Sequence, residues 1–397
     1  DMVLEGVFRL ALRRIQKSDW AGAAVILERG TALAAPSERT RSPGDAGREH
    51  YFLARALIQT GESERGLKEY EAIIREQPLS YYMLHAYSRL VENDPERARR
   101  ALEAAQDEHD QLPFSIGQKG DLARPAFIRV AELIRQSDID GARRELTLMD
   151  GAGGKASPEL WWGVALLYAR AGSAQLSHQV ARWRVKNWLE RWPVGAWRQA
   201  WEIAFPRPHL ETVLKEAEQN QLDPALVYAI MREESAFDAG AVSPANAYGL
   251  MQLMQGTARG FGKLAGVPTD TQALKTPRVN ITLGTRVLAN YMSRFPQNAL
   301  LGIPSYNAGP GRPMRWLKDF PSVDFDVWVE LIPFRETRMY TKRVLQSRGA
   351  YRFLYYADGS EGDPLLLPEQ LLPVQSPLVP AIPGDVERPL ENARNDE

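Results

Sequence analysis

Apolar residues recur at intervals of three and four along the first 210 residues, which predicts one helix after another in this part of the chain. Clusters of turn-forming residues interrupt the pattern at 35–44 and 150–154, where we expect loops. The helical pattern resumes at Asp223–Pro224, a capping residue followed by a first-turn proline. The chain is therefore predicted to be helical on both sides of these loops.

Two stretches have the internal spacing of a helix pair. In 51–78, the small, aromatic and turn-forming positions resemble those of a tetratricopeptide-like repeat: Ala54, Gly61, Gly66, Tyr70 and Pro78. A second stretch begins at Ser157–Pro158 and has matching residues at the corresponding offsets: Trp161, Ala165, Tyr168 and Gly172. Because each pair must stack on its neighbours to bury its apolar face, the two predict a helical solenoid.

These patterns predict an all-α fold in four segments. Residues 1–155 form a superhelical solenoid of tetratricopeptide-like helix pairs, 156–212 a helical linker, and 213–356 a compact helical domain. Residues 357–397 form a proline-rich acidic tail without helical periodicity. This tail could pack along the body through Leu365, Leu366 and Leu367.

Tryptophan is concentrated between residues 161 and 201. Seven of the ten tryptophans lie there: Trp161, Trp162, Trp183, Trp188, Trp192, Trp197 and Trp201. Tryptophan rings can stack on sugars, so the cluster could be a glycan platform. Their recurrence at helical spacing favours the other interpretation, a packed linker core, because aromatic residues dominate core energetics.

Composition excludes several classes of site and partner. The 397 residues include no cysteine, which excludes disulfides, thiol nucleophiles and cysteine-ligated metals. The formal net charge of -1 argues against nucleic acid as a partner. Between Asp223 and Tyr355, however, 16 Lys and Arg stand against 10 Asp and Glu, an excess that would attract a polyanionic polymer. A mixed solvated surface is the alternative interpretation.

Glu234 is a candidate general acid on the helix that begins at Pro224. Apolar residues form a buried stripe on that helix: Leu226, Val227, Ile230 and Met231. Glu234 follows Ile230 by four residues, so its carboxyl lies at the edge of the stripe, where burial would raise its pKa into the range useful to a general acid. Glu233 is three residues from Ile230, so periodicity alone separates the two glutamates poorly.

Four short blocks follow one another between residues 231 and 340. They are MREESAF at Met231–Phe237, GLMQLM at Gly249–Met254, SYNAG at Ser305–Gly309 and FRETRMY at Phe334–Tyr340. Together they resemble the catalytic domain of soluble lytic transglycosylases, lysozyme-like enzymes that cleave the glycan strands of peptidoglycan. The resemblance implies a lysozyme-like α-helical catalytic domain. It also selects Glu234, because the catalytic glutamate of the family directly precedes a serine.

The resemblance further implies a set of substrate-binding residues: Ser243, Gln252, Met254, Tyr306, Asn307 and Glu336. Tyr306 would bring its hydroxyl close to Glu234 and could donate a hydrogen bond to it. Glu336 would bind an N-acetyl group or position catalytic polar groups; a salt bridge with Arg335 or Arg338 is the alternative.

The chain departs from the family pattern at two positions. Asn246 stands where glycine is common, a mild change because asparagine tolerates a left-handed backbone. Gln255 stands where proline is usual, which leaves the local helix geometry open.

The reaction implied by the resemblance uses one carboxyl group. Glu234 would protonate the bond between N-acetylmuramic acid and N-acetylglucosamine, and then act as base on the muramyl C6 hydroxyl to close a 1,6-anhydro ring. No metal or other cofactor is required. The five histidines all precede the first block, so none within the block region can form a Ser–His dyad or a zinc site. Two alternatives remain, a lysozyme-like hydrolase and a non-catalytic glycan-binding scaffold.

The same resemblance sets expectations for location and partners. We expect a periplasmic or cell-envelope protein, although the first residues do not have the pattern of a signal peptide, which suits a mature or trimmed form. Peptidoglycan glycan strands are the expected partner. We expect a monomer, whose solenoid could recruit cell-envelope proteins.

Overall fold

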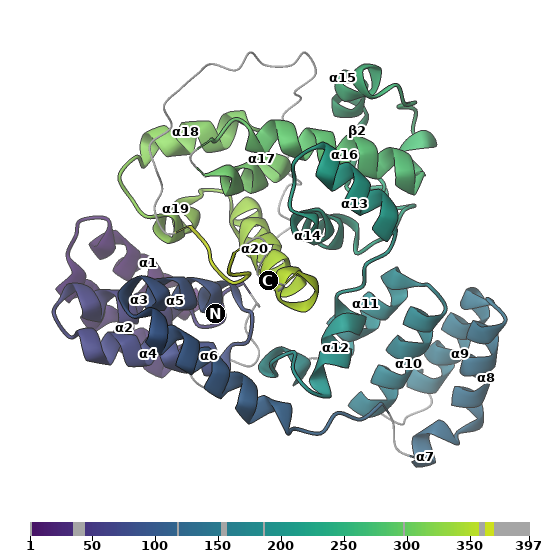
Figure 1. Cartoon of the computed structure of the whole chain (residues 1–397), viewed down its shortest axis with the longest axis horizontal. Coiled ribbons are helices and arrows are strands. Elements are labelled where there is room, and N and C mark those ends of the chain that lie inside the picture. The colour runs from purple at the N-terminus through teal and green to yellow at the C-terminus, as the bar shows by residue number, and fades with distance from the viewer. Residues whose placement is uncertain are drawn as a thin grey trace. The chain divides into compact units, whose positions relative to one another are not determined.

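The structure, a computed structural model, describes residues 2–34, 44–116, 119–151, 157–185, 187–296, 298–356 and 362–368. These residues are mostly helical, with one two-stranded sheet among them (Figure 1). The prediction of an all-α fold is confirmed. Packing separates two compact units, Asp1–Ala104 with Glu211–Glu397, and Ala105–Leu210. The four predicted segments follow a different division, and their boundaries stay predictions.

The N-terminal helices are α1 (Met2–Ile15), α2 (Trp20–Ala34), α3 (Arg48–Gln59), α4 (Ser63–Glu76), α5 (Tyr81–Asn93) and α6 (Pro95–Asp110). From α1 to α5, each helix packs on the next one along the chain, as expected for a solenoid. The first predicted helix pair is α3 with α4. Gly66 allows these two helices to approach closely, since a Cβ there would lie 2.7 Å from the carbonyl oxygen of Ala54.

The unit of residues 105–210 contains α7 (Lys119–Leu122), α8 (Pro125–Arg135), α9 (Ile139–Gly151), α10 (Pro158–Arg170), α11 (Ala174–Trp183), the 3₁₀ helix η2 (Asn187–Glu190) and α12 (Trp197–Ala204). The second predicted helix pair is α10 with α11. Ser157 caps α10, because its Oγ accepts a hydrogen bond from the Leu160 amide at 3.1 Å.

The tryptophan cluster is mainly a packed core. Six of its rings are buried: Trp161, Trp162, Trp188, Trp192, Trp197 and Trp201. Trp188 and Trp201, for example, meet edge to face with ring centroids 4.7 Å apart. Trp183 is the exception within the cluster, with 68% of its surface exposed.

The rest of the first unit contains α13 (Leu210–Gln219), α14 (Pro224–Ser235), β1 (Ala247–Tyr248), β2 (Leu253–Met254), α15 (Gln255–Ala265), η3 (Ala273–Lys275), α16 (Pro277–Met292), η4 (Ala299–Leu301), α17 (Gly302–Ala308), α18 (Gly311–Asp319), α19 (Phe325–Leu331) and α20 (Arg335–Tyr355). The strands pair antiparallel, with Ala247 opposite Met254. Helix α20 packs on α14, α17 and α19, and also on α5 from the N-terminal part of the unit.

Because α20 has helices on several sides, most of its residues are buried, including Thr337, Thr341 and Lys342. Its contact with α5 depends on Gly349, where a Cβ would lie 2.7 Å from a methyl carbon of Leu84. The absence of a side chain at Gly349 therefore allows the N-terminal helices to pack directly against α20.

Buried charges join the N-terminal helices to α19. Asp326 is fully buried, and its carboxylate accepts hydrogen bonds from Arg55 Nη1 at 2.6 Å and from the Tyr51 hydroxyl at 2.6 Å. Burial by itself would raise the pKa of Asp326, but the positive charges of Arg55 and Arg89, together with the Tyr51 hydrogen bond, outweigh burial and lower that pKa to about 2. Asp326 is therefore ionised and structurally paired at neutral pH.

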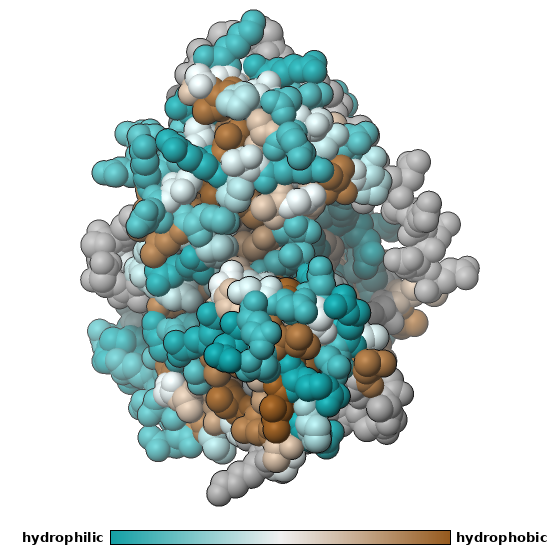
Figure 2. Space-filling model, turned by 90° about the vertical axis from the view of Figure 1, so that its right-hand side faces the viewer, coloured by the Kyte–Doolittle hydropathy of each residue, from teal (hydrophilic) through white to brown (hydrophobic). Residues whose placement is uncertain are grey.

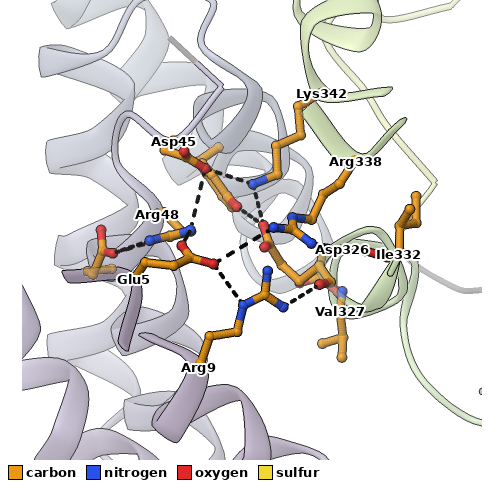
Figure 3. Close-up of polar contacts among 12 residues, drawn as sticks. Glu5, Arg9, Asp45, Arg48, Asp326, Val327, Ile332, Arg338 and Lys342 are labelled. Carbon is orange, nitrogen blue, oxygen red and sulfur yellow. Dashed lines mark hydrogen bonds and ion pairs between the residues drawn. The ribbon is translucent and has the colours of Figure 1, made fainter. Parts of the chain in front are cut away.

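Lys342 extends this buried group of charges to α20 (Figure 3). Its Nζ lies 2.5 Å from Glu330 of α19 and 2.9 Å from Asp45. Glu330 also accepts a hydrogen bond from the Tyr82 hydroxyl of α5. We call Arg55, Asp326, Glu330, Lys342 and Asp45 the interhelical ion cluster.

Part of the predicted tail packs on the N-terminal helices. Leu365 and Leu367 are buried, and the Leu367 amide donates to Ser88 Oγ at 2.9 Å. The prediction that all three leucines pack along the body is wrong for Leu366, which is 38% exposed because it lies between the two inward-facing leucines. Residues 357–361 and 369–397 lie outside the described residues.

On the face of the molecule in Figure 2, hydrophobic residues form separate groups among hydrophilic ones. Across the described residues, no helix combines the length and the hydrophobicity needed to span a membrane.

Candidate active site

Glu234 lies at the C-terminal end of α14. The helix begins as predicted, because Asp223 Oδ1 accepts the Ala225 amide at 2.8 Å. It ends where Ala236 and Phe237 adopt left-handed backbone angles, with φ of 50° and 67°. The Ser235 hydroxyl donates to the Leu250 carbonyl at 2.8 Å and so ties this end of the helix to the loop before β2. Helix α14 is thus capped at its start and tied to the neighbouring loop at its end, where Glu234 lies.

The neighbouring Glu233 is held in a buried ion pair. Its side chain is 1% exposed and accepts hydrogen bonds from Arg232 Nη1 at 2.6 Å, Arg343 Nε at 3.0 Å and Ser347 Oγ at 3.0 Å. Two cationic donors and one hydroxyl therefore surround this carboxylate. Such a group is well suited to holding α14 against α20 and poorly suited to exchanging protons with a substrate.

Glu234 is partly exposed and differs from Glu233 in its hydrogen-bond donor. The Tyr340 hydroxyl of α20 donates to Glu234 Oε1 at 2.8 Å. This donor orients the carboxyl and carries no positive charge itself. Tyr340 is part of the fourth sequence block but was not among the site residues predicted from the sequence.

Tyr306 lies on α17 and is 1% exposed. Its hydroxyl donates to the Met251 carbonyl at 2.9 Å, so its proton is used to hold the loop before β2. The hydroxyl of Tyr340 donates to Glu234, and the predicted hydrogen bond from Tyr306 to Glu234 stays a prediction. A direct role of Tyr306 in substrate binding stays a prediction.

The loop between α14 and α15 carries Ser243, Gln252 and Met254. Ser243 Oγ accepts the Ala247 amide at 3.1 Å, and Gln252 Nε2 donates to the Gly249 carbonyl at 2.9 Å. Both side chains therefore stabilise the loop itself, while Met254 on β2 is partly exposed. Asn246 has the left-handed φ of 60° that its replacement of glycine suggested.

Asn280 of α16 holds this loop through its side-chain amide, and it was not among the residues predicted from the sequence. The residue is fully buried; its Oδ1 accepts the Met251 amide at 2.7 Å and its Nδ2 donates to the Tyr248 carbonyl at 2.8 Å. Gly249, with φ of 74°, must be glycine at this point because a Cβ would lie 2.3 Å from the Leu274 carbonyl oxygen. Asn280 follows Met251 by 29 positions, so only the tertiary fold brings it to the loop.

Asn307 and Glu336 form the second polar pair. Asn307 Nδ2 donates to Glu336 Oε1 at 3.1 Å, and the Thr337 hydroxyl donates to Asn307 Oδ1 at 2.6 Å. Glu336 is exposed. Arg338 contacts other groups, the Ile332 carbonyl at 2.9 Å and Glu5 at 3.8 Å, so the partner of Glu336 here is Asn307.

The first turns of α20 bring these polar groups onto one helix face. Glu336, Thr337 and Tyr340 are spaced by one, three and four residues, and they contact Asn307 of α17 and Glu234 of α14. The resulting arrangement contains one partly exposed carboxyl that can exchange a proton and one exposed amide–carboxylate pair that can bind polar substrate groups. Among the described residues, no group of three or more His, Cys, Asp or Glu side chains is placed to hold a metal ion.

Residues 211–329 match the family described as Transglycosylase SLT domain, so this part of the chain is an SLT domain. The matched range includes Glu234, the α14–α15 loop and Asn307. Glu336 and Tyr340 follow the matched range.

Comparison with curated proteins finds the soluble lytic murein transglycosylase of Escherichia coli. It is 36% identical over 155 residues, which are 38% of this chain and 24% of that protein. The matched residues therefore cover about a quarter of the length of this relative.

Two solved structures resemble a larger part of the chain. The lytic transglycosylase Slt from Pseudomonas aeruginosa, solved as an inactive mutant, superposes with a TM-score of 0.67 and 27% identity, over 90% of this chain and 52% of that one. The 70 kDa soluble lytic transglycosylase from Escherichia coli gives a TM-score of 0.66 and 25% identity, over 90% and 53% of the two chains. The similarity thus includes the helices that precede the SLT domain.

Proposed function

We propose that the chain is a lytic transglycosylase that cleaves the β-1,4 bond between N-acetylmuramic acid and N-acetylglucosamine in peptidoglycan. The observation that carries the proposal is the environment of Glu234, a partly exposed carboxyl at a helix end that Tyr340 orients at 2.8 Å. The SLT domain of residues 211–329 and the names of its relatives support this substrate class.

Glu234 acts first as a general acid. It gives its proton to the glycosidic oxygen, so that N-acetylglucosamine leaves as a neutral alcohol and positive charge develops on the muramyl C1. The muramyl N-acetyl group stabilises that charge from within the substrate. Glu233 is excluded from this role because Arg232, Arg343 and Ser347 occupy its carboxylate.

Glu234, now ionised, acts next as a base on the muramyl C6 hydroxyl. The C6 oxygen attacks C1 and closes a 1,6-anhydro ring, and the hydroxyl proton restores Glu234 to its acid form. The cycle is balanced without water, metal or cofactor. An intramolecular hydroxyl has a large effective concentration, which favours ring closure over attack by solvent.

The remaining residues bind and orient the glycan in this proposal. The exposed Glu336, held by Asn307, accepts a hydrogen bond from an N-acetyl N–H group of the substrate. Ser243 and Gln252 maintain the α14–α15 loop, and Met254 offers an apolar contact to a sugar ring. Tyr306 holds the same loop through the Met251 carbonyl and binds substrate from that position.

Analysis of the reaction products tests the proposal. Purified sacculi are digested with the whole chain, and the soluble muropeptides are examined by mass spectrometry before and after borohydride reduction. We expect 1,6-anhydromuramyl ends, which borohydride does not reduce. Mainly reducible muramyl ends, one water heavier, would establish hydrolysis by the same site. Binding to sacculi without release of any product would indicate the scaffold alternative.

Because peptidoglycan is the proposed substrate, we propose that the protein acts in the periplasm or cell envelope, and that it does so as a monomer. The N-terminal helices provide a surface on which envelope proteins could assemble.

A further inference from the structure

Helices α9, α10 and α11 line a pocket of about 840 Å³ that has no part in the proposed reaction. All of its lining residues belong to the unit of residues 105–210, whereas Glu234 belongs to the other unit. The volume is within the range of sites that hold small organic ligands. The pocket is therefore large enough for a saccharide fragment.

An exposed aromatic ring stands at this pocket. Trp183, the last residue of α11, lines it with 68% of its surface exposed, although the other tryptophans of the cluster are buried. The Arg182 guanidinium lies 5.3 Å from the centre of the Trp183 ring and restricts its orientation. A large aromatic side chain on the surface of a pocket provides a flat apolar face without contributing to the core.

The pocket is also positively charged. Arg143 of α9 and Arg184, which follows α11, both line it, and the lining residues that the structure describes include no acid. The Arg184 guanidinium stacks over Trp161, 4.8 Å from the ring centre. Arg143 lies 3.6 Å from Asp140, but both side chains are largely exposed, so this pair is weak and leaves the pocket basic.

Tyr168 adds a polar atom that the fold itself does not satisfy. Its side chain is 1% exposed and lines the pocket, and its hydroxyl has no hydrogen-bond partner among the described residues. A buried hydroxyl without a partner lowers the stability of the folded state, and such groups are uncommon in native proteins. Burial raises the pKa of Tyr168, and the charge of nearby Arg143 opposes this shift, so the hydroxyl stays protonated and close to a cation.

We infer that this pocket is a second glycan-binding site, which takes an acidic sugar. The sugar ring stacks on Trp183, a carboxylate pairs with Arg143 and Arg184, and a ligand oxygen accepts the Tyr168 hydroxyl. The neutral hydrogen-bonding side chains Gln179 and Thr147 also line the pocket, a composition that suits sugar hydroxyl and N-acetyl groups. The source of the acidic sugar rests on the proposed function, since muramyl residues of peptidoglycan carry lactyl carboxylates.

The test uses the whole chain with Glu234→Gln, so that the glycan is bound and not consumed. Calorimetry measures binding of a peptide-free tetrasaccharide of alternating N-acetylglucosamine and N-acetylmuramic acid, and of chitotetraose, which lacks the carboxylates. We expect the chain to bind two tetrasaccharides. The Trp183→Ala variant should bind only one, or bind the second with an affinity about tenfold lower. Arg143→Gln should weaken binding of the acidic tetrasaccharide and leave the affinity for chitotetraose unchanged.

Matched controls are available on α9. Leu148→Ala removes another exposed hydrophobic residue, and Arg144→Gln removes the adjacent charge; neither residue lines the pocket, so binding should be retained. One bound tetrasaccharide both with and without Trp183 would overturn the inference, as would equal losses in the control variants. An acidic peptide without sugar that binds as tightly at Trp183 would also overturn it.

The outcome is separable from that of the proposed function. A variant with Trp183→Ala and the natural Glu234 should cleave short soluble glycans at the original rate. The same variant should bind less intact sacculus. If binding depends on Trp183 but no anhydro products form, the proposed reaction is refuted and the second site is retained. If anhydro products form but binding does not depend on Trp183, the second site is refuted and the proposed reaction is retained.

Discussion

Two groups of polar residues contact α20, and they differ in exposure and in the partners they have. In the interhelical ion cluster, Asp326 and Lys342 are fully buried and paired with opposite charges from other helices. At the first turns of the same helix, Tyr340 orients the partly exposed Glu234, and Asn307 holds the exposed Glu336. The two groups thus use one helix in different ways.

The difference indicates which polar groups stabilise the fold and which are available for chemistry. A buried charge must be paired with charge to offset its desolvation, and that pairing limits its ability to exchange a proton. A partly exposed carboxyl such as Glu234, by contrast, can be reached by a substrate group. The same contrast occurs within one dipeptide, where Glu233 has two arginine partners and Glu234 has the tyrosine.

The largest expected effect comes from Glu234→Gln. The amide is nearly isosteric but cannot give and recover a proton, so glycan cleavage should fall by roughly 100- to 10,000-fold or more. Release of muropeptides from sacculi measures this loss. Thermal unfolding should change little, because Glu234 is partly exposed.

Glu233→Gln is the matched control at the adjacent position. It leaves Arg232 and Arg343 facing a neutral amide in a site that is 1% exposed, so we expect a lower melting temperature and a nearly unchanged rate per folded molecule. A rate loss in Glu233→Gln, with full activity in Glu234→Gln, would reverse the assignment of the two residues.

Asp326→Asn should have the next largest effect, on stability alone. It removes the buried partner of Arg55 and leaves that arginine only the more exposed Asp324, 2.6 Å from its Nη2. Breaking a buried ion pair typically costs about 3 to 5 kcal/mol of unfolding free energy, and we expect a loss toward the lower end of that range. Urea denaturation measures this change. The exposed pair of Arg99 and Glu103 provides the control, and Glu103→Gln should unfold like the natural chain. Equal effects of the two variants would contradict a structural role for the buried pair.

The pH dependence of stability should show the same pairing. The folded pKa of Asp326, about 2, lies below its ordinary value of 3.8, so its contribution is present above pH 4 and is lost as the pH falls toward 2. The loss expected from this group is about 2 kcal/mol. Denaturation at a series of pH values should therefore show a steeper decline below pH 4 for the natural chain than for Asp326→Asn. Parallel curves would exclude Asp326 as a source of the acid sensitivity.

Tyr340→Phe should have the smallest effect of the series. It removes the hydroxyl that donates to Glu234 Oε1 and leaves the ring packing in place. We expect kcat to fall about tenfold with KM nearly unchanged, since the hydrogen bond orients the catalytic carboxyl and does not bind substrate. Tyr306→Phe is the comparison, because its hydroxyl bonds to the Met251 carbonyl. If Tyr306→Phe alone lowers kcat, Tyr306 is the residue that acts on Glu234.

The sequence was sufficient to predict the helices around Glu234, whereas the roles of the site residues stay predictions. Asp223 and Pro224 mark the start of α14 because capping depends on residues close in sequence. The helix pair of α3 and α4 follows from the spacing of its small residues. Tyr340 was visible within the fourth block but had no distinguishing feature there, since the spacing of a tyrosine does not reveal what its hydroxyl bonds to.

What the sequence determined by itself is local: the helical class, the helix starts, and the order of blocks that marks the SLT domain. Tertiary structure alone decided the partners. Arg55 meets Asp326 across 271 positions, and Tyr340 meets Glu234 across 106. Glu233 and Glu234 have nearly equal positions on the periodic pattern, yet two arginines pair with Glu233 and a tyrosine hydroxyl donates to Glu234. Periodicity defines which face of a helix is buried, but the groups opposite that face come from distant segments, and they determine which partners a carboxylate has.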